Sequence, residues 1–263
     1  MSLDKKPIQA GELIYLAHEK ISFMIPFTPN RNLSTNKGEI KFGENQYWGD
    51  TIKNHTDTEE FTILHPTISD RLMKVKRATT ISYPKDIGAV IMETDIFSGA
   101  NILEIGTGSA GFAIAISSIV GATGKIYSFE RRPEHQKIAI KNFEKLARFQ
   151  NGEFILKDDV HETGFGLDLK MDTIYLDVPE PGGLLWAAKE VLTPGGNIAI
   201  IIPCVEQLAD VVRELPKHGF TRIRAKEIFE RGIRPTPGRT RPYDRMVAHT
   251  VYLLFASSSN QTN

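Results

Sequence analysis

The chain has 263 residues, 41% hydrophobic and 24% charged, which is enough for one medium-sized domain with a buried core and a second, small one. Its 32 Lys and Arg balance 32 Asp and Glu, so the net charge argues neither for nor against a nucleic-acid partner. The single cysteine, Cys204, excludes a disulfide scaffold and any zinc site built from cysteines.

The first 70 residues carry the pattern of a small β-domain. Short alternating segments are separated by Gly, Asn and Pro, which is typical of strands joined by turns. These segments are residues 11–20, 22–27, 38–42, 46–50 and 60–66. We therefore expect a small β-barrel-like domain over residues 1–70. A connector over residues 71–85 then begins the second domain, which we expect to span residues 71–263.

From residue 85 the pattern changes to amphipathic helices that alternate with short apolar strands. The expected helices are residues 85–96, 109–121, 133–148, 183–192 and 205–218. The expected strands are residues 101–105, 125–130, 153–157, 172–177, 197–202, 222–229 and 249–256. The last two strands have no helix between them. The pattern predicts an α/β fold, a Rossmann-like, doubly wound and mostly parallel sheet with an antiparallel hairpin at one edge.

A glycine-rich turn follows the strand at 101–105. Gly106, Gly108 and Gly111 match G-x-G-x-x-G between a strand and a helix, a turn that lets a ligand approach the backbone closely. Two cofactor classes use such a turn, a nicotinamide dinucleotide and S-adenosylmethionine, and Glu130 at the end of the next strand suits the ribose of either. Glu104 favours the second, because the α-ammonium of S-adenosylmethionine would balance a buried carboxylate. The alternative for Glu104 is a salt-bridged residue of the core.

Two later strand ends also carry acidic side chains. Asp158 and Asp159 close the third strand, where a carboxylate is suited to accept a hydrogen from the cofactor's adenine amino group, and Asp177 closes the fourth. In open α/β sheets, ligands bind outside the carboxyl ends of the strands. The alternative for each aspartate alone is a helix cap or turn residue. Together the acidic strand ends indicate one crevice.

Positive charge gathers near the C-terminal end. Residues 217–247 hold nine Lys and Arg against three Asp and Glu, a net of +6, whereas residues 1–70 hold seven against ten, a net of −3. A second basic cluster lies within residues 71–77. The stretch around residues 231–245 is rich in Gly and Pro and is expected to be a loop, either a solvated surface or a grip for RNA phosphates. Its arginines are Arg231, Arg234, Arg239, Arg241 and Arg245.

Some functions are not expected. The seven histidines do not cluster with carboxylates at the spacing of metal ligands, so we propose no metal. The N-terminal residues contain no hydrophobic leader, and the longest nearly apolar stretch, residues 112–122, is too short to cross a bilayer. We therefore expect a cytoplasmic protein with no membrane partner.

Five motifs together resemble one family. They are Tyr83-Pro-Lys-Asp86, Glu104-Ile-Gly-Thr-Gly-Ser109, Asp159-Val-His-Glu162, Asp177-Val-Pro-Glu-Pro181, and Arg241-Pro-Tyr-Asp-Arg-Met246 with His249-Thr250. Over nearly its whole length the chain resembles the class I S-adenosylmethionine methyltransferases of the TrmI family, which modify N1 of adenosine in tRNA. The resemblance implies formation of 1-methyladenosine at position 58 of the T-loop, or at 57 and 58, and a homotetramer. It also implies a set of cofactor-binding residues: Glu104, Gly106, Thr107, Gly108, Ser109, Glu130, Arg131, Asp159 and Asp177.

For catalysis we expect Asp177 to accept a hydrogen bond from the N6 amino group of the target adenine, which orients N1 and stabilises the positive charge that develops on the ring. Tyr83 is expected to stack on or line the extruded base, or else to be an interfacial core tyrosine. Two departures from the family pattern bear on base packing: Gly182 and Gly183 stand where a Trp is usual, and Thr80 lies near the place of a Gln.

Three other functions stay open from the sequence. A methyltransferase acting on a protein carboxyl group or a small molecule would share the cofactor site. A non-catalytic tRNA-binding partner subunit would have lost the glycines and the acidic strand ends, which are all present here. A nicotinamide-dependent oxidoreductase needs an acid/base pair for hydride transfer, and no such pair is evident.

Overall fold

The computed structural model describes residues 6–19 and 21–260. The leader-free N-terminus expected above and the polar C-terminal tail therefore lie partly outside the described residues. The chain divides into two compact units, one up to Lys74 and one from Val75 onward. The expected division into domains at residues 1–70 and 71–263 stays a prediction.

The N-terminal unit is antiparallel. Its larger sheet has the strand order β2-β1-β6-β5, and β3 and β4 form a separate hairpin. The elements are β1 (Leu13–Ala17), β2 (Ser22–Pro26), β3 (Asn32–Thr35), β4 (Gly38–Lys41), β5 (Thr51–Lys53), β6 (Glu60–Leu64) and α1 (Ile68–Met73). Alternate residues of β1 and β6, among them Ile14, Leu16 and Phe61, form a buried core. An N-terminal β region was expected and is present.

The prediction of a strand at residues 46–50 is wrong. Residues 46–50 form a turn, because the Asp50 carboxylate accepts the Tyr47 N–H at 2.9 Å and the Asp50 N–H donates to the Tyr47 carbonyl. Gly49 follows the bend with φ +86°, and the strand begins only at Thr51. The strand β3 and the short helix α1 were not expected from the sequence.

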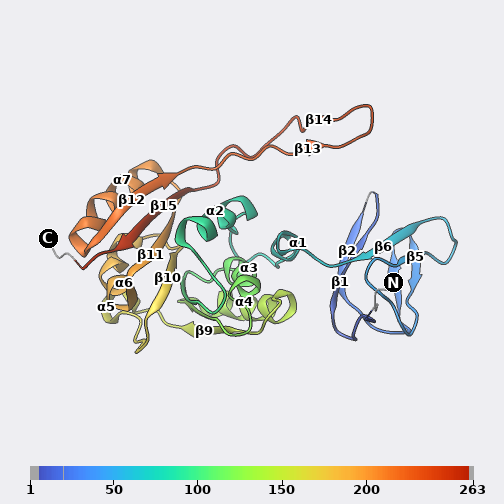
Figure 1. The fold of residues 1–263 in the computed structure, drawn as a ribbon, viewed down its shortest axis with the longest axis horizontal. Helices are drawn as coiled ribbons and strands as arrows, with labels where there is room; N and C mark the ends of the chain where they lie inside the picture. Colours follow the sequence, from blue (N-terminus) through green and yellow to red (C-terminus); the bar gives the residue numbers. More distant parts are fainter. Residues whose placement is uncertain (1–5, 20, 261–263) are drawn as a thin grey trace, which may run out of the picture. The chain divides into compact units, whose positions relative to one another are not determined.

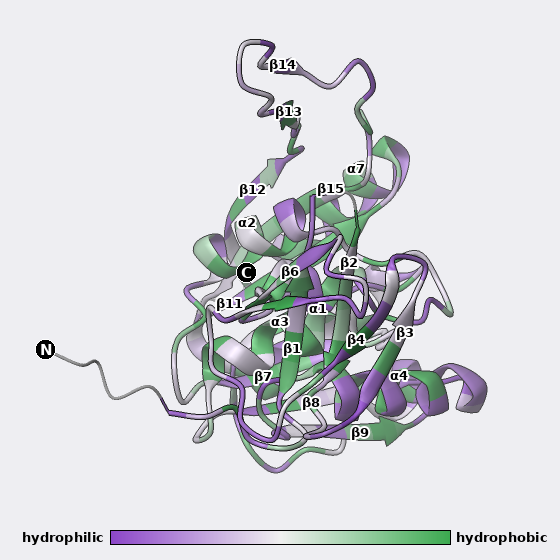
Figure 2. Ribbon diagram, turned by 90° about the vertical axis from the view of Figure 1, so that its right-hand side faces the viewer, coloured by the Kyte–Doolittle hydropathy of each residue, from purple (hydrophilic) through white to green (hydrophobic). Residues whose placement is uncertain are grey.

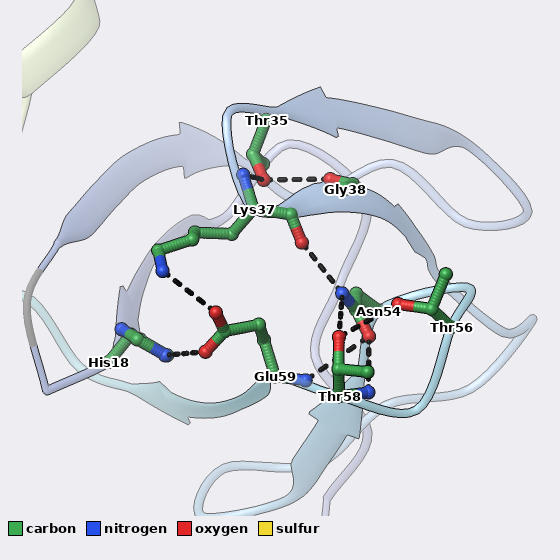
Figure 3. Close-up of polar contacts among 8 residues, drawn as sticks. All are labelled: His18, Thr35, Lys37, Gly38, Asn54, Thr56, Thr58 and Glu59. Carbon is green, nitrogen blue, oxygen red and sulfur yellow. Dashed lines mark hydrogen bonds and ion pairs between the residues drawn. The ribbon is translucent and has the colours of Figure 1, made fainter.

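A polar network joins the loops of this unit (Figure 3). Asn54 is buried, donates to the Lys37 carbonyl at 2.7 Å and accepts the backbone N–H groups of Thr58 and Glu59. The Glu59 carboxylate lies 2.7 Å from both Lys37 Nζ and His18 Nε2. Hydrogen bonds from these two side chains hold the pKa of Glu59 below its usual value despite partial desolvation. The network ties the β3–β4 turn to the β5–β6 turn.

The second unit is built on a sheet with the order β12-β15-β11-β10-β7-β8-β9. The strands β11, β10, β7, β8 and β9 are parallel to their neighbours in this order. Strand β15 is antiparallel to both β11 and β12. The strands are β7 (Asn101–Ile105), β8 (Lys125–Glu130), β9 (Gly152–Leu156), β10 (Met171–Leu176), β11 (Leu192–Ile202), β12 (Phe220–Lys226) and β15 (Tyr252–Ser258). The doubly wound, mostly parallel sheet with an antiparallel hairpin at one edge is confirmed.

Helices flank this sheet on both faces (Figure 1). They are α2 (Pro84–Thr94), α3 (Gly111–Val120), α4 (Pro133–Leu146), α5 (Val160–Thr163), α6 (Leu185–Val191), α7 (Val205–Glu214) and the 3-10 helices η1 (Pro181–Leu184) and η2 (Leu215–His218). Helix α3 begins at Gly111, two residues later than expected, because Ala110 adopts a left-handed conformation with φ 62°. The expected helix 205–218 tightens into η2 at Pro216, which lacks the N–H that an α-helix requires.

The strands of this sheet are mainly hydrophobic, whereas α4 carries a polar outer face (Figure 2). Leu103 and Ile105 of β7 pack with α6 and Val211 of α7 in one core. Because side chains alternate along a strand, Glu104 points to the opposite face, toward α3. The position of Glu104 under α3 follows from this alternation.

An arm, defined as residues 227–250, leaves the sheet between β12 and β15 (Figure 1). Its residues 231–245 were expected as loop and contain a short antiparallel hairpin, β13 (Ile233–Arg234) with β14 (Arg241–Pro242). Residues 227–229 and 249–250 were expected to belong to the flanking strands, but β12 ends at Lys226 and β15 begins at Tyr252. At its base His249 Nδ1 lies 2.7 Å from a Glu227 carboxylate oxygen, and His249 Nε2 lies 3.1 Å from the Pro203 carbonyl. These contacts join the two ends of the arm to the end of β11.

No helix among residues 6–19 and 21–260 is long and apolar enough to cross a membrane.

Candidate active site

Two adjoining cavities open at the carboxyl ends of β7, β8 and β10. The first, of about 250 Å³, is lined by Thr79, Thr80, Ile81, Ser82, Glu104, Gly106, Thr107, Gly108, Ser109, Gly111, Phe112, Arg132, Tyr175 and Asp177. The second, of about 260 Å³, is lined by Ile105, Gly106, Phe129, Glu130, Arg131, Arg132, Lys157, Asp158, Val160, His161, Asp177, Val178, Pro179, Glu180 and Leu184. Gly106, Arg132 and Asp177 border both cavities. Both cavities therefore lie where open α/β sheets bind their ligands, outside the carboxyl ends of the strands.

The glycine turn requires glycine at two positions. Gly106 has φ +94°, and a Cβ there would lie 2.1 Å from the Asp177 carbonyl oxygen. Gly108 has φ +54°, and a Cβ there would lie 2.8 Å from Thr79 Oγ1. The third left-handed residue of the turn is Ala110, since Gly111 already belongs to α3. The turn is therefore pressed against the end of β10 with no room for a side chain at Gly106.

Glu104 lies at the floor of the first cavity and is 1% exposed. The Ser128 hydroxyl donates to its carboxylate, and Ser128 Oγ is also 2.6 Å from Thr107 Oγ1. Burial raises the pKa of Glu104 to about 8, although the Ser128 hydrogen bond opposes the shift. Within the described residues no Lys, Arg or His forms an ion pair with Glu104, so the salt-bridged alternative does not hold.

Glu130 is buried at the end of β8 and lines the second cavity. Its Oε2 accepts the Gly108 N–H at 3.1 Å, and its Oε1 accepts the Arg132 N–H and Nε, each at 3.1 Å. Burial pushes its pKa upward, but these hydrogen bonds outweigh burial and hold the pKa below the usual value. Glu130 is thus an ionised carboxylate fixed against the glycine turn. Arg131, which follows it, lines the second cavity.

Asp177 follows β10 and is exposed to the cavities. Its Oδ2 lies 3.4 Å from Ser82 Oγ. The surrounding protein displaces water and raises the pKa of Asp177 to about 6, a shift that the Ser82 hydrogen bond reduces. Near neutral pH most of this group is ionised, so a hydrogen-bond acceptor stands where both cavities meet.

The segment 78–82 forms one wall of the first cavity, which sequence reasoning missed. Ser109 Oγ accepts the Ala78 N–H at 2.8 Å and the Thr79 N–H at 3.4 Å, so a predicted cofactor residue also anchors this wall. Asn142 of α4 donates to the carbonyls of Ser109 and Lys76 and accepts the Lys76 N–H. The nearest sequence signal was the Tyr83-Pro pair that follows the segment.

Tyr175 and Phe112 were also missed. Their rings stack at 3.8 Å between centroids with an interplanar angle of 8°, and both line the first cavity. Tyr175 is a polar aromatic in the buried part of β10, two residues before Asp177. That spacing places both side chains on one face of the sheet and is the signal that marks Tyr175.

The second cavity contains Asp158 in place of the expected Asp159. The Asp159 carboxylate is exposed and lies 3.8 Å from Lys157 Nζ, while its backbone begins α5. His161 also lines this cavity, and a Cβ at residue 183 would lie 2.9 Å from its Nδ1. Gly183 thus leaves room for His161. The cofactor role of Asp159 stays a prediction.

Tyr83 lies at the N-terminal end of α2 and lines neither cavity. Its carbonyl accepts the N–H groups of Asp86 and Ile87, both at 3.0 Å, and so begins the helix. The structure brings Ser82, not Tyr83, against Asp177. A catalytic part for Tyr83 stays a prediction.

The five arginines of the arm are exposed and line neither cavity. Arg231 donates to the Tyr243 carbonyl at 3.2 Å, and the Arg234 guanidinium lies 5.4 Å from the Tyr243 ring centroid. Arg241 lies 3.9 Å from an Asp244 carboxylate oxygen. Their expected contact with RNA stays a prediction.

The residues present fit a cationic nucleoside cofactor. Glu104 is a buried carboxyl group without a cationic partner among the described residues, and Gly106 leaves a close approach to the backbone that a Cβ would fill. Glu130 adds a fixed ionised carboxylate beside the glycine turn. In the part of the chain that the structure describes, no group of three His, Cys, Asp or Glu side chains is placed to hold a metal ion.

The chain is similar to known tRNA methyltransferases. A family model described as "tRNA methyltransferase complex GCD14 subunit" matches residues 61–235. The tRNA (adenine(57)-N(1)/adenine(58)-N(1))-methyltransferase TrmI of Methanocaldococcus jannaschii is 33% identical over 78% of this chain and 79% of its own length. The tRNA (adenine(58)-N(1))-methyltransferase TrmI of Thermus thermophilus is 30% identical over 78% of this chain and 80% of its own.

Two solved structures have the same fold. A SAM-dependent O-methyltransferase from Thermotoga maritima superposes with a TM-score of 0.82 and 32% identity, covering 96% of this chain and 95% of its own. The tRNA (m1A58) methyltransferase TrmI of Aquifex aeolicus has a TM-score of 0.79 and 25% identity, covering 97% of this chain and 100% of its own.

Proposed function

The chain belongs to the family of the tRNA methyltransferase complex GCD14 subunit, which includes the TrmI enzymes, and we propose that it forms 1-methyladenosine at position 58 of the tRNA T-loop, or at positions 57 and 58. It is a methyltransferase, and its methyl donor is S-adenosylmethionine. The family resemblance expected from the motifs is confirmed. The adenosine position and the site residues are what we propose.

The cofactor would be held by the two cavities. Glu104, with Thr107 and Ser109 beside it, would face the cationic amino acid part, and the backbone of Gly106 and Gly108 would lie against the ligand. Glu130 would accept ribose hydroxyls, while Arg131 and Asp158 or Asp159 would border the adenine. When bound, S-adenosylmethionine supplies a methyl carbon on a cationic sulfur, whose bond to carbon breaks as a nucleophile's lone pair attacks.

Asp177 would orient the target base. A carboxylate only accepts hydrogen bonds, so it suits the N6 amino group of adenine and disfavours the O6 carbonyl of guanine. N1 of adenine already carries a lone pair, so the site needs no strong base. As N1 gains the methyl group, positive charge develops on the ring, and the ionised Asp177 stabilises it. Tyr83 would line the extruded base.

The arm arginines would contact tRNA phosphates and offset the few kcal/mol that base extrusion costs.

We also propose a homotetramer in the cytoplasm. Exposed apolar side chains on the arm, including Phe229, Ile233 and Val247, support association with another chain. Sedimentation analysis of the purified protein tests the assembly, and a monomer would contradict it.

One observation carries the proposal: an exposed, largely ionised Asp177 borders both cavities, where a methyl group and an acceptor base would meet. The test offers labelled cofactor to an unmodified tRNA and to the same tRNA with guanosine in place of the T-loop adenosines at 57 and 58. We expect label in the first RNA only. Equal labelling of both RNAs would show that the methylated nucleoside is not adenosine at position 57 or 58.

A second function has one observation in its favour, the likeness to a SAM-dependent O-methyltransferase. It predicts transfer to an oxygen of a protein or small molecule and none to RNA. Offering carboxyl-bearing peptides in parallel with tRNA separates the two functions. Label in peptide alone would replace our proposal.

A further inference from the structure

We propose that Ser82 is a positioning residue for methyl transfer: it links the buried Tyr175 hydroxyl to the Asp177 carboxylate and so fixes the orientation in which Asp177 meets the acceptor base. The proposal rests on the proposed function, because Asp177 is the group that meets the acceptor. It assigns a part to two residues, Ser82 and Tyr175, that lie in no motif singled out in the sequence.

The distances define a chain of three side chains. Tyr175 Oη lies 2.6 Å from Ser82 Oγ, and Ser82 Oγ lies 3.4 Å from Asp177 Oδ2. Tyr175 and Asp177 are two residues apart on β10 and its extension, so their side chains leave the sheet on the same face. Ser82, from the connector, lies between them. Among the described residues, Asp177 Oδ2 alone is engaged, and Oδ1 stays available to the acceptor.

The direction of the chain follows from chemistry. An ionised carboxylate only accepts, so the Ser82 hydroxyl must donate to Asp177 and therefore must accept from Tyr175. Tyr175 is 1% exposed and its ring stacks on Phe112, so the donor is rigid. Burial raises the pKa of its phenol well above the usual value, which keeps the proton on Tyr175. The Ser82–Asp177 distance is long for such a bond, and hydrogen bonds of this kind tighten when the substrate binds.

The main variants are Ser82→Ala, Ser82→Thr and Tyr175→Phe. For Ser82→Ala we expect the single-turnover rate on tRNA to fall about tenfold, with cofactor Kd and melting temperature near those of the wild type. Ser82→Thr keeps the hydroxyl and should retain most of the rate. Tyr175→Phe should lose less than Ser82→Ala, and the double variant should be no slower than Ser82→Ala, because the three groups act in series. The matched control is Ser117→Ala, which removes a buried hydroxyl that donates to the Ile114 carbonyl of the same helix, α3.

A readout that needs no activity is the NMR titration of the Asp177 carboxyl carbon in the free protein. Ser82→Ala removes the hydroxyl that donates to Asp177, so the titration midpoint of Asp177 should move to higher pH. The acidic limb of the plot of methylation rate against pH should move in the same direction. A wild-type rate and midpoint in Ser82→Ala would overturn the proposal, as would an equal loss of cofactor affinity. If the wild type methylates no tRNA but the midpoint still moves, the proposed function fails and the link between Ser82 and Asp177 stands.

Discussion

Single side chains decide whether this site can hold a ligand. Gly106 is the clearest case, because its backbone is left-handed and its α-carbon faces the Asp177 carbonyl. In Gly106→Ala, the Cβ would force the turn away from β10 and strain the backbone, at a cost of at least ~2 kcal/mol. We expect loss of cofactor binding by calorimetry together with a lower melting temperature.

The control for this prediction is Gly88→Ala in α2, where a Cβ would meet nothing within 4 Å. Alanine in a helix interior is favoured over glycine by about 0.5–1 kcal/mol, so this variant should be slightly more stable and should bind cofactor normally. Normal cofactor binding by Gly106→Ala would show that the turn does not press against the ligand.

Glu104 makes stability depend on pH. Its pKa rises from 4.5 in the unfolded chain to about 8 in the folded protein, so the folded state holds one more proton between these values. The stabilisation from this group is complete below pH 4.5 and is lost as pH rises toward 8, by up to about 1.4 kcal/mol per pH unit. Glu104→Gln does not titrate, so its unfolding free energy should fall less over this range.

Urea unfolding of the ligand-free protein at pH 5.5, 7 and 8.5 measures this difference, with Glu44→Gln on the exposed surface of the N-terminal unit as control. Parallel pH profiles for wild type and Glu104→Gln would mean that Glu104 stays ionised in the folded protein. In that case a cationic partner, and not burial, would determine the pKa of Glu104.

Among helices and strands, the sequence predicted what local patterns dictate. The strands at 101–105 and 125–130 were placed to the residue, since apolar runs between turn signals leave little choice. The turn at 46–50 was mistaken for a strand because its aromatic residues favour strands, while the Asp50 hydrogen bond that makes the turn is not visible in a propensity.

The acidic strand ends and the glycine turn were likewise visible in the sequence. The wall at 78–82 was not, because distant residues hold it: Ser109 accepts the Ala78 and Thr79 N–H groups, and Asn142 bonds the backbone of Lys76 and Ser109. Asp158 and Asp159 are neighbours in sequence, and only the start of α5 separates the side chain that lines the cavity from the one that does not. Contacts between distant segments leave no local pattern to read.

The arm is the element for which a binding prediction is sharpest. Arg239 and Arg245 are exposed, and within the described residues their side chains make no hydrogen bond or ion pair. Replacing both with Gln should leave the fold intact and reduce the slope of log affinity for tRNA against log salt by about 2. The rate at saturating tRNA should stay within about twofold, because neither residue lines a cavity.

A charge-matched control is the double variant of Lys125 and Lys145 to Gln. Both lysines are exposed, and Lys125 begins β8 at the end of the sheet opposite the cavities. The salt slope of this control should equal that of the wild type. An unchanged slope in the arginine variant, measured by titrating tRNA at several salt concentrations, would remove the arm from the RNA surface.

Taken over its full length, the protein separates two tasks. The carboxyl ends of the strands carry acidic groups that suit a cationic methyl donor. The arm carries arginines that suit a polyanion. The balanced total of 32 positive and 32 negative residues therefore conceals two regions of opposite local charge. The N-terminal region of residues 1–70, with its net of −3, is not suited to grip phosphates by charge alone.

The identity of the methylated atom tests the account most directly. Unmodified tRNA is incubated with the wild-type protein and S-adenosylmethionine, digested to nucleosides, and separated so that 1-methyladenosine and N6-methyladenosine are distinguished by mass spectrometry and mobility. Because Asp177 would accept the N6 amino hydrogen and leave N1 as the nucleophile, we predict 1-methyladenosine from the T-loop alone. N6-methyladenosine, or a methyl group on the protein with none on the RNA, would contradict the account.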